Sequence, residues 1–321
     1  MGLFSSFCSG VSSFVSSFAS GIRSVCSGIS SAVSGAISAL GNFAGKAIST
    51  FIGAVASKAA GFLKVASGIM TGPLGPILGP IVVDLLVKLV VKVVSKIAEE
   101  NEVVEKNERP EEIGYRLEEA DKHEDWKRRD EFKSFKEYYA YLKEQIPAEE
   151  IDRDNLQKNI GVYSVLGMQA EVQAIEEKIG LRIPKASLVE VGRSAMEFKE
   201  VQAFVRAFDA LGYKNLNISE YLKGTLPAGE LERITAAVLD ALKFYFPEKT
   251  ERDLLTRLNE MRRASEDDKV LLSVYKEDVQ AEYGAELQAA RQSGELPKDT
   301  EKILEEVDFK FGEKSKVEAA K

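Results

Sequence analysis

Large apolar residues recur with a helical period along the first 70 residues of the chain. Nineteen apolar positions cover 65 residues in 18 steps, about 3.6 residues per step, which is the period of an α-helix. Six of them also form a row with an eleven-residue repeat, from Phe7 to Phe62. We therefore expect one long amphipathic helix, or several in register. The nineteen positions are Phe4, Phe7, Val11, Phe14, Phe18, Ile22, Val25, Ile29, Val33, Ile37, Leu40, Phe43, Ile48, Phe51, Val55, Ala59, Phe62, Val65 and Ile69.

The opposite face of this segment is made of serine and glycine, with 17 serines and 13 glycines in residues 1–80. Both residues are mediocre helix formers, so the segment should need a lipid interface or packed neighbours to cover its apolar face. Amphipathic helices of this composition resemble lipid-packing sensors, in which insertion of bulky apolar residues drives binding. The residues expected to insert are Phe4, Phe7, Phe14, Phe18, Ile22, Ile29, Leu40, Phe51 and Phe62.

Small residues also recur four positions before a glycine, nine times in the first eighty residues. Such spacing removes bulk from one helix face and lets two backbones approach closely, as when helices associate in lipid. The pattern predicts a helix-packing face and homo-oligomerisation. Its glycines are Gly21, Gly28, Gly35, Gly41, Gly45, Gly53 and Gly61.

A Gly-Pro segment at 72–80 follows, and its three prolines predict a bend or an extended stretch. The apolar run 81–97 comes next, with Asp84, Lys88, Lys92 and Lys96 on one polar stripe. At ~25 Å, this run is marginal for spanning a hydrocarbon core of ~30 Å. We expect the stripe to face a pore, a partner helix or water.

Other readings of the N-terminal region remain open at this point. Although membrane interaction is the favoured interpretation, a Gly/Ala/Ser-rich helical layer could also be the tightly packed core of a soluble assembly, or a hydrophobic hairpin hidden by the chain's other part. A cleaved signal peptide is not expected, because no charged segment precedes the apolar residues. The sequence Met1 to Ser6 matches the N-myristoylation pattern with Gly2 as acceptor, and Cys8 would be a second acylation site.

Charge divides the chain near residue 100. Residues 1–100 carry a net charge of +4, and the first acidic residue is Asp84, whereas the remainder carries −12. We divide the chain into a membrane-interacting region (1–98), a charged linker (99–112), an all-helical soluble domain (113–295) and a charged tail (296–321). The fold class predicted is all-α, a long amphipathic helical region followed by an acidic helical bundle.

Within the acidic domain, apolar residues fall into helical stripes that end at proline or glycine. The longest stripe runs from Leu188 through Ala195 and Phe198 to Leu211 and stops at Gly212. Another stops at Gly180, and a capping sequence begins at Thr250. A last helix is expected to hold Val270 to Leu287.

Candidate chemistry is absent from the sequence. It contains no phosphate-binding loop, dinucleotide fingerprint or nucleophile elbow, so we name no catalytic residue and no cofactor, and a non-enzymatic function is the favoured prediction. Two cysteines and one histidine predict no metal site, and the net charge of −8 argues against nucleic acid as a partner. The acidic cluster around His123 is best explained as a solvated helix face.

Three functions remain. The first is a non-enzymatic, membrane-active protein that inserts its N-terminal helices into a lipid bilayer and permeabilises it. In architecture, such a chain resembles bacterial pore-forming toxins and secreted effectors, with a chaperone or delivery apparatus as further partner. The second is a membrane-binding structural adaptor, such as a virion entry or ejection protein or a remodelling scaffold, anchored without permeabilising. The third is an enzyme tethered to a membrane. The expected location is membrane-associated, after secretion or delivery into a target cell.

Overall fold

The protein is all-helical, as the sequence predicts. The computed structural model describes residues 21–311, which form fifteen α-helices, three short 3₁₀ helices and no strand beyond one isolated bridge between Arg182 and Asn215. The α-helices are α2 (Ile22–Lys46), α3 (Thr50–Ala66), α4 (Gly75–Glu100), α5 (Pro110–Lys122), α6 (Phe135–Gln145), α7 (Arg153–Lys158), α8 (Ile160–Ile179), α9 (Lys185–Arg193), α10 (Phe198–Ala210), α11 (Ile218–Leu222), α12 (Ala228–Tyr245), α13 (Glu251–Glu266), α14 (Asp268–Val274), α15 (Lys276–Ser293) and α16 (Lys298–Glu306). The 3₁₀ helices are η1 (Ser67–Thr71), η2 (Arg129–Glu131) and η3 (Ala148–Glu150).

The first apolar stripe is divided between α2 and α3, two helices that pack along each other. The break at 47–49 is stabilised from a distance, because the backbone amides of Ile48 and Ser49 donate to the carboxylate of Asp121 in α5. The Ser49 side chain in turn accepts from the amide of Ile52 and caps α3. The break therefore depends on a tertiary contact that the helical period does not reveal.

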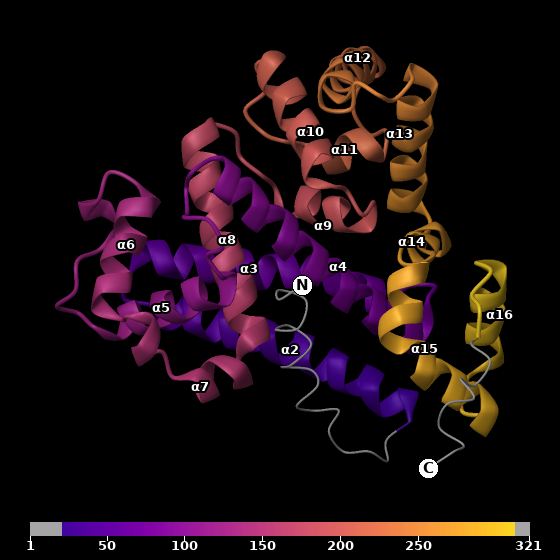
Figure 1. The fold of residues 1–321 in the computed structure, drawn as a ribbon, viewed down its shortest axis with the longest axis horizontal. Coiled ribbons are helices and arrows are strands. Elements are labelled where there is room, and N and C mark those ends of the chain that lie inside the picture. The colour runs from indigo at the N-terminus through magenta and orange to yellow at the C-terminus, as the bar shows by residue number, and fades with distance from the viewer. Residues whose placement is uncertain (1–20, 312–321) are drawn as a thin grey trace.

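Helix α4 runs through the middle of the molecule (Figure 1) and packs against α2, α8, α9, α10, α15 and α16. It begins at Gly75, six residues before the helix start expected from the prolines. Pro76 lies in its first turn, where no amide partner is needed, and Pro80 is accommodated inside the helix. The non-helical part of the Gly-Pro segment is limited to residues 72–74.

The other helices surround α4 on several sides (Figure 1): α5–α7 at one end, α10–α13 above it and α14–α16 at the opposite end. Apolar residues from Ile22 to Phe309 form one continuous core. The regions on either side of residue 100 therefore share a core in the described residues.

The closest helix approach in this core joins α5 and α8. A side-chain carbon at Gly114 would collide with the backbone of Tyr163, and one at Gly167 would collide with the carbonyl of Pro110. Glycine thus lets these two backbones touch. These glycines belong to the acidic part of the chain, outside the small-residue pattern of the N-terminal region.

The expectation of one long helix from Leu188 to Leu211 is wrong. The chain leaves the helix after Arg193, and Ala195 adopts a positive φ of 40° before α10 begins. Arg257 of α13 donates to the carbonyls of Ser194 and Ala195 and to the Glu200 carboxylate, which stabilises the interruption. The predicted stop at Gly212, the stop at Gly180 and the Thr250 cap are confirmed.

The last apolar stripe is also divided, into α14 and α15. Beyond it, α16 lies within the segment 296–321 that its charge suggested to be a tail, and its Leu304 is fully buried.

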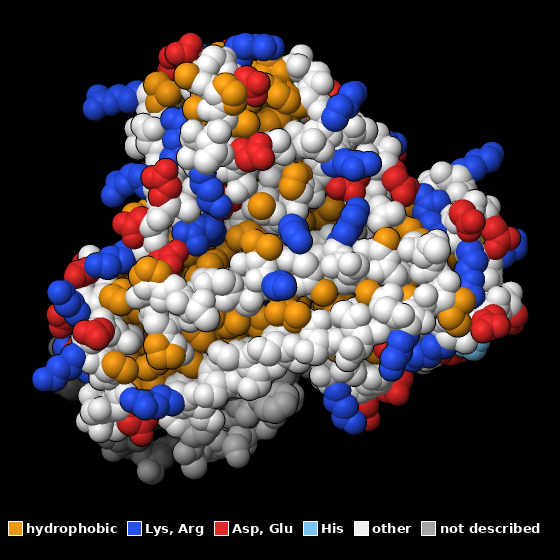
Figure 2. All heavy atoms as spheres, turned by 180° about the vertical axis from the view of Figure 1, so that it is seen from behind, with side chains coloured by type: hydrophobic (Ala, Val, Ile, Leu, Met, Phe, Trp, Pro, Cys, Tyr) orange, Lys and Arg blue, Asp and Glu red, His pale blue; other side chains and the backbone are white. Residues whose placement is uncertain are grey.

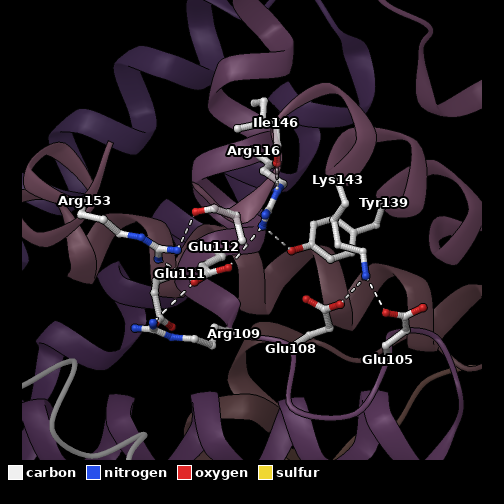
Figure 3. Close-up of polar contacts among 11 residues, drawn as sticks. Glu105, Glu108, Arg109, Glu111, Glu112, Arg116, Tyr139, Lys143, Ile146 and Arg153 are labelled. Atoms are coloured by element: carbon white, nitrogen blue, oxygen red, sulfur yellow. Dashed lines mark hydrogen bonds and ion pairs between the residues drawn. The ribbon is translucent and has the colours of Figure 1, made fainter. Parts of the chain in front are cut away.

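The charged linker is tied to the helices beside it (Figure 3). Lys143 of α6 donates to both Glu105 and Glu108, at 2.6 Å each. Buried Arg116 of α5 donates to the Ile146 carbonyl at 2.9 Å and to the Tyr139 hydroxyl at 3.0 Å, so α5 and α6 are held together as well. Such charge-assisted bonds give the segment a defined course.

Candidate functional site: the exposed surface of α2 and α3

Helix α2 is long, uncharged over most of its length and peripheral. Between Arg23 and Lys46 no residue is charged, a run of 22 residues. At 1.5 Å per residue this run spans about 33 Å, close to the hydrocarbon thickness of ~30 Å. Only 17% of the most apolar 18-residue window of α2 is buried. A helix apolar enough to cross a bilayer therefore lies on the outside of the helical body.

The outward face of α2 is polar without being charged. Ser24, Ser27, Ser31, Ser34, Ser38 and Asn42 all lie exposed on it. In the view from behind (Figure 2), a band of backbone, uncharged polar and hydrophobic atoms crosses the lower half of the molecule, while charged side chains crowd the top and the two ends. Leaving water costs a hydroxyl face far less than a charged one.

Helix α3 is bound to the body more firmly than α2. Lys58 forms an ion pair with Glu176 of α8 at 2.9 Å, and the helix packs against both α8 and α9. Phe62 and Ile52 are fully buried. The charges of Lys58 and Lys64 also divide the apolar length of α3. Of the two helices, α2 has fewer contacts to lose on leaving the body.

The residues expected to insert are distributed unevenly. Ile22, Ile29, Leu40 and Phe62 are buried against the core, and Phe51 is half-buried against Phe135 and Tyr138. In the folded protein these side chains hold α2 and α3 on the body, so exposing them to lipid requires separation of the helices from α4 and α8. The remaining predicted residues, Phe4, Phe7, Phe14 and Phe18, lie outside the described residues.

The predicted packing glycines contact little in the part of the chain that the structure describes. Among residues 21–311, a side-chain carbon at Gly28, Gly35, Gly41 or Gly45 would meet no atom within 4 Å. Three others have neighbours: Gly21 has Glu295, Gly53 has the end of α2, and Gly61 has Lys185. Close packing between helices through the α2 glycines, with another chain as partner, stays a prediction.

The polar stripe of α4 faces the C-terminal helices at its start and water at its end. Lys88 is buried and pairs with Asp84 at 2.7 Å and with Glu282 of α15 at 2.6 Å. The Tyr283 hydroxyl donates to Asp84 at 2.6 Å. Further along, Lys92 and Lys96 are exposed, and Lys96 pairs with Glu99 and Glu100 of its own helix.

This buried cluster ties α15 to α4. Burial raises the pKa of Asp84, and the charge and hydrogen bond of Lys88 oppose that rise. Burial likewise acts to lower the pKa of Lys88, but Asp84 and Glu282 outweigh it and the pKa is raised. The ammonium is thus held charged between two carboxylates, which explains how a charged residue is accommodated inside an apolar helix layer.

The most deeply buried carboxyl among the described residues, Glu171 of α8, was not anticipated from the sequence. It is fully buried, accepts from the Ser95 hydroxyl at 2.8 Å and has one oxygen without a hydrogen-bond partner. Burial raises its pKa well above the usual range. The signal in the sequence is a single charged residue between Met168 and Ile175, a stretch that otherwise contains only apolar residues and two glutamines.

No candidate metal site is found in residues 21–311. No group of three or more His, Cys, Asp or Glu side chains in this range could hold a metal ion. His123 stacks on Trp126, with ring centroids 4.2 Å apart. The acylation candidates Gly2 and Cys8 lie outside the described residues.

Two helical stretches of the described chain are long and apolar enough to cross a membrane, Ile22–Lys46 and Thr50–Thr71. Core helices of soluble proteins can pass the same test, so exposure matters: the second stretch is 44% buried in its most apolar window, against 17% for the first. The chain matches no protein-family model, no curated protein and no solved structure.

Proposed function

We propose that the protein is a non-enzymatic membrane-active protein that inserts α2, followed by α3, into a lipid bilayer and permeabilises it. One observation carries the proposal: α2, which contains an uncharged run of 22 residues, lies at the surface. Only six of the 25 residues of α2 are buried. An apolar helix of a soluble protein is ordinarily the most buried one. Here, of the two described stretches long and apolar enough to cross a bilayer, α2 is the less buried.

The proposed mechanism begins with separation of α2 from α4 and α8 at a membrane surface. Arg23 and Lys46 would flank the bilayer core, and the four cations before residue 84 favour an anionic leaflet at roughly 1 kcal/mol each. The serine face of α2 would then face water or a neighbouring copy. Several copies side by side, packed through Gly28 and Gly35, would enclose a polar path.

A disulfide lock tests whether α2 must move. The Cys26 thiol donates to the Ile77 carbonyl at 3.3 Å, which brings the backbone of residue 77 close enough to test a cysteine there as a disulfide partner. The full-length I77C variant, with Cys8 replaced by serine, is oxidised, and free thiols are titrated to verify the bond. We expect oxidised protein to release no dye from phosphatidylcholine–phosphatidylglycerol vesicles and reduced protein to release it. Equal leakage from both forms would contradict the proposal.

A membrane-anchoring adaptor is the second candidate. It is favoured by the attachment of α3 to α8 through Lys58 and Glu176, because a single inserted helix anchors a protein without forming a pore. Vesicle flotation separates the two functions. Co-flotation of the reduced variant with no dye release would support the adaptor.

A further inference from the structure

A groove runs between α2 and the start of α8, with α4 as its floor. It consists of two adjoining cavities of about 240 and 230 Å³ that share Ala39, Asn159 and Val162 in their walls. Along α2 the groove extends from Ile29 to Phe43. The first cavity is walled mainly by apolar side chains, and a cavity of roughly 150 Å³ already accepts a benzene ring. Each of the two cavities therefore has room for an aromatic side chain.

The groove exists because α2 presents small residues toward α8. Ala32, Gly35 and Ala39 lie on this side of α2, all exposed, and a side-chain carbon at Gly35 would meet no neighbour among the described residues. Larger side chains at these positions would fill the space. A small-residue face beside an apolar wall is suited to a bulky ridge on another helix.

A segment with such a ridge is attached at the end of α2. Residues 1–20 precede Gly21 and contain no charged side chain. Their apolar residues, Phe4, Phe7, Val11, Phe14 and Phe18, follow the helical period. If residues 4–18 are helical, as this period predicts, they extend about 22 Å, and groove contact along α2 begins about 12 Å from Gly21.

These lengths define how residues 4–18 would align with α2. A segment that turns back at Ala19–Gly21 and runs antiparallel to α2 places Phe18 beside Ile22, Phe7 beside Val33 and Phe4 beside Ala36. Val33 and Ala36 both line the larger cavity. The two phenylalanines of the segment that lie furthest from its junction with α2 therefore reach the space that α2 leaves open.

We infer that this groove is the docking site of the Phe-rich segment 4–18 of the same chain, which inserts Phe4 and Phe7 between α2 and α8. Covalent attachment favours this occupant, because a tethered segment has an effective concentration in the millimolar range. The uncharged segment also brings no further charge beside Asp84 and Lys158, the two charged residues that line the larger cavity. Docking would cover the apolar side of α2 until a membrane competes for the phenylalanines.

Cross-linking of the full-length protein tests this register. In it, native Cys8 lies beside Ala32, which lines the groove. With Cys26 replaced by alanine, Ala32→Cys should form an intramolecular disulfide with Cys8 under mild oxidation. Ser34→Cys on the exposed outer face of α2 is the control, at nearly the same height along the helix. We expect disulfide formation about tenfold faster at position 32 than at position 34, because docking raises the local thiol concentration on one face only.

Two further variants make the result decisive. Phe4→Glu with Phe7→Glu should reduce the rate at position 32 to that at position 34, whereas Ser9→Glu with Ser13→Glu, on the opposite face, should leave it unchanged. Equal rates at positions 32 and 34 in the unmutated segment would overturn the inference. A disulfide-linked dimer in place of the intramolecular product would overturn it too, since it assigns the groove to a second copy. No lipid is present, so the outcome is independent of the proposed membrane activity.

Discussion

Helices α2 and α4 both come from the charge-poor N-terminal region, yet the structure places them oppositely. Of the 25 residues of α2, six are buried, whereas 18 of the 26 residues of α4 are. The helix that carries six charged residues, α4, lies at the centre, and the helix with a 22-residue uncharged run, α2, lies outside. Charge content alone therefore does not decide which apolar helix is buried.

The difference follows from what surrounds each helix. The charges of α4 have partners within the body, since α15 supplies Glu282 and Tyr283 to the Lys88–Asp84 pair. The branched apolar side chains of α4 fill the space between this helix and the helices that pack against it. The small residues of α2 fill little space and leave a groove against α8. The helix rich in branched apolar side chains is the buried one here, and the helix rich in small residues stays at the surface.

The largest effect is expected from breaking the buried ion pair of α4. Lys88→Ala leaves Asp84 and Glu282 without their cation, and should lower the free energy of unfolding by about 3–5 kcal/mol. Urea unfolding followed by circular dichroism measures this. Lys96→Ala, which removes an exposed pair, should change stability by less than ~1 kcal/mol. Equal losses in the two variants would mean that the buried cluster contributes no more than a surface ion pair.

A charge in the middle of α2 should suppress membrane activity without unfolding the protein. Ser31 is exposed, so Ser31→Glu is tolerated in the folded body, but an acid at the centre of a membrane helix costs roughly 2.5–3.5 kcal/mol. Dye release at equal protein concentration should therefore fall about 100-fold. Ser273→Glu, at an exposed position of α14, is the matched control and should release as much dye as the unmodified protein. Undiminished leakage from Ser31→Glu would exclude insertion of α2.

Glycine substitutions sharpen the comparison between the two regions. Gly167→Ala places a carbon against the Pro110 carbonyl and should cost about 1–3 kcal/mol through forced separation of α5 and α8. Gly41→Ala on α2 meets no neighbour and should instead stabilise the helix by about 0.5–1 kcal/mol. Thermal unfolding of both variants checks the opposite signs. A loss at Gly41 would indicate a packing partner for this face in solution.

The smallest expected effect is a pH dependence from Glu171. Since burial raises the pKa of this carboxyl in the folded state, the folded protein retains its proton longer than the unfolded chain. The stability associated with Glu171 is fully present below its ordinary pKa and is lost as pH rises toward the raised value. Glu171→Gln should therefore lose less stability between pH 5 and pH 8 than the unmodified protein. Exposed Glu149→Gln serves as control and should follow the unmodified protein.

Local patterns predicted the elements of this fold better than their interruptions. Helical periods located the apolar faces of α2, α3 and α4, and glycine and capping patterns located the ends of α8, α10 and α13. The breaks after Lys46 and Arg193 depend on Asp121 and Arg257, which lie far away in sequence. Long-range hydrogen bonds of this kind leave no periodic signal.

The candidate site was predictable to the same extent. The uncharged length of α2 and its serine face are visible in the sequence, because both are properties of a single helix. The exposure of α2, the central position of α4 and the partners of Asp84 and Lys88 are not, since they depend on which helices pack together. The N-terminal region and the acidic helices could thus be told apart by charge, but their common core could not.

The most direct test of the central claim is the depth of α2 in a bilayer. An environment-sensitive fluorophore is attached to Ser34→Cys, at the middle of the uncharged run, with Cys8 and Cys26 replaced by alanine. After addition of phosphatidylcholine–phosphatidylglycerol vesicles, insertion predicts quenching by a lipid labelled at the end of its acyl chain and protection from iodide. If the protein binds the vesicles while the fluorophore stays open to iodide and unaffected by the lipid quencher, α2 does not enter the membrane.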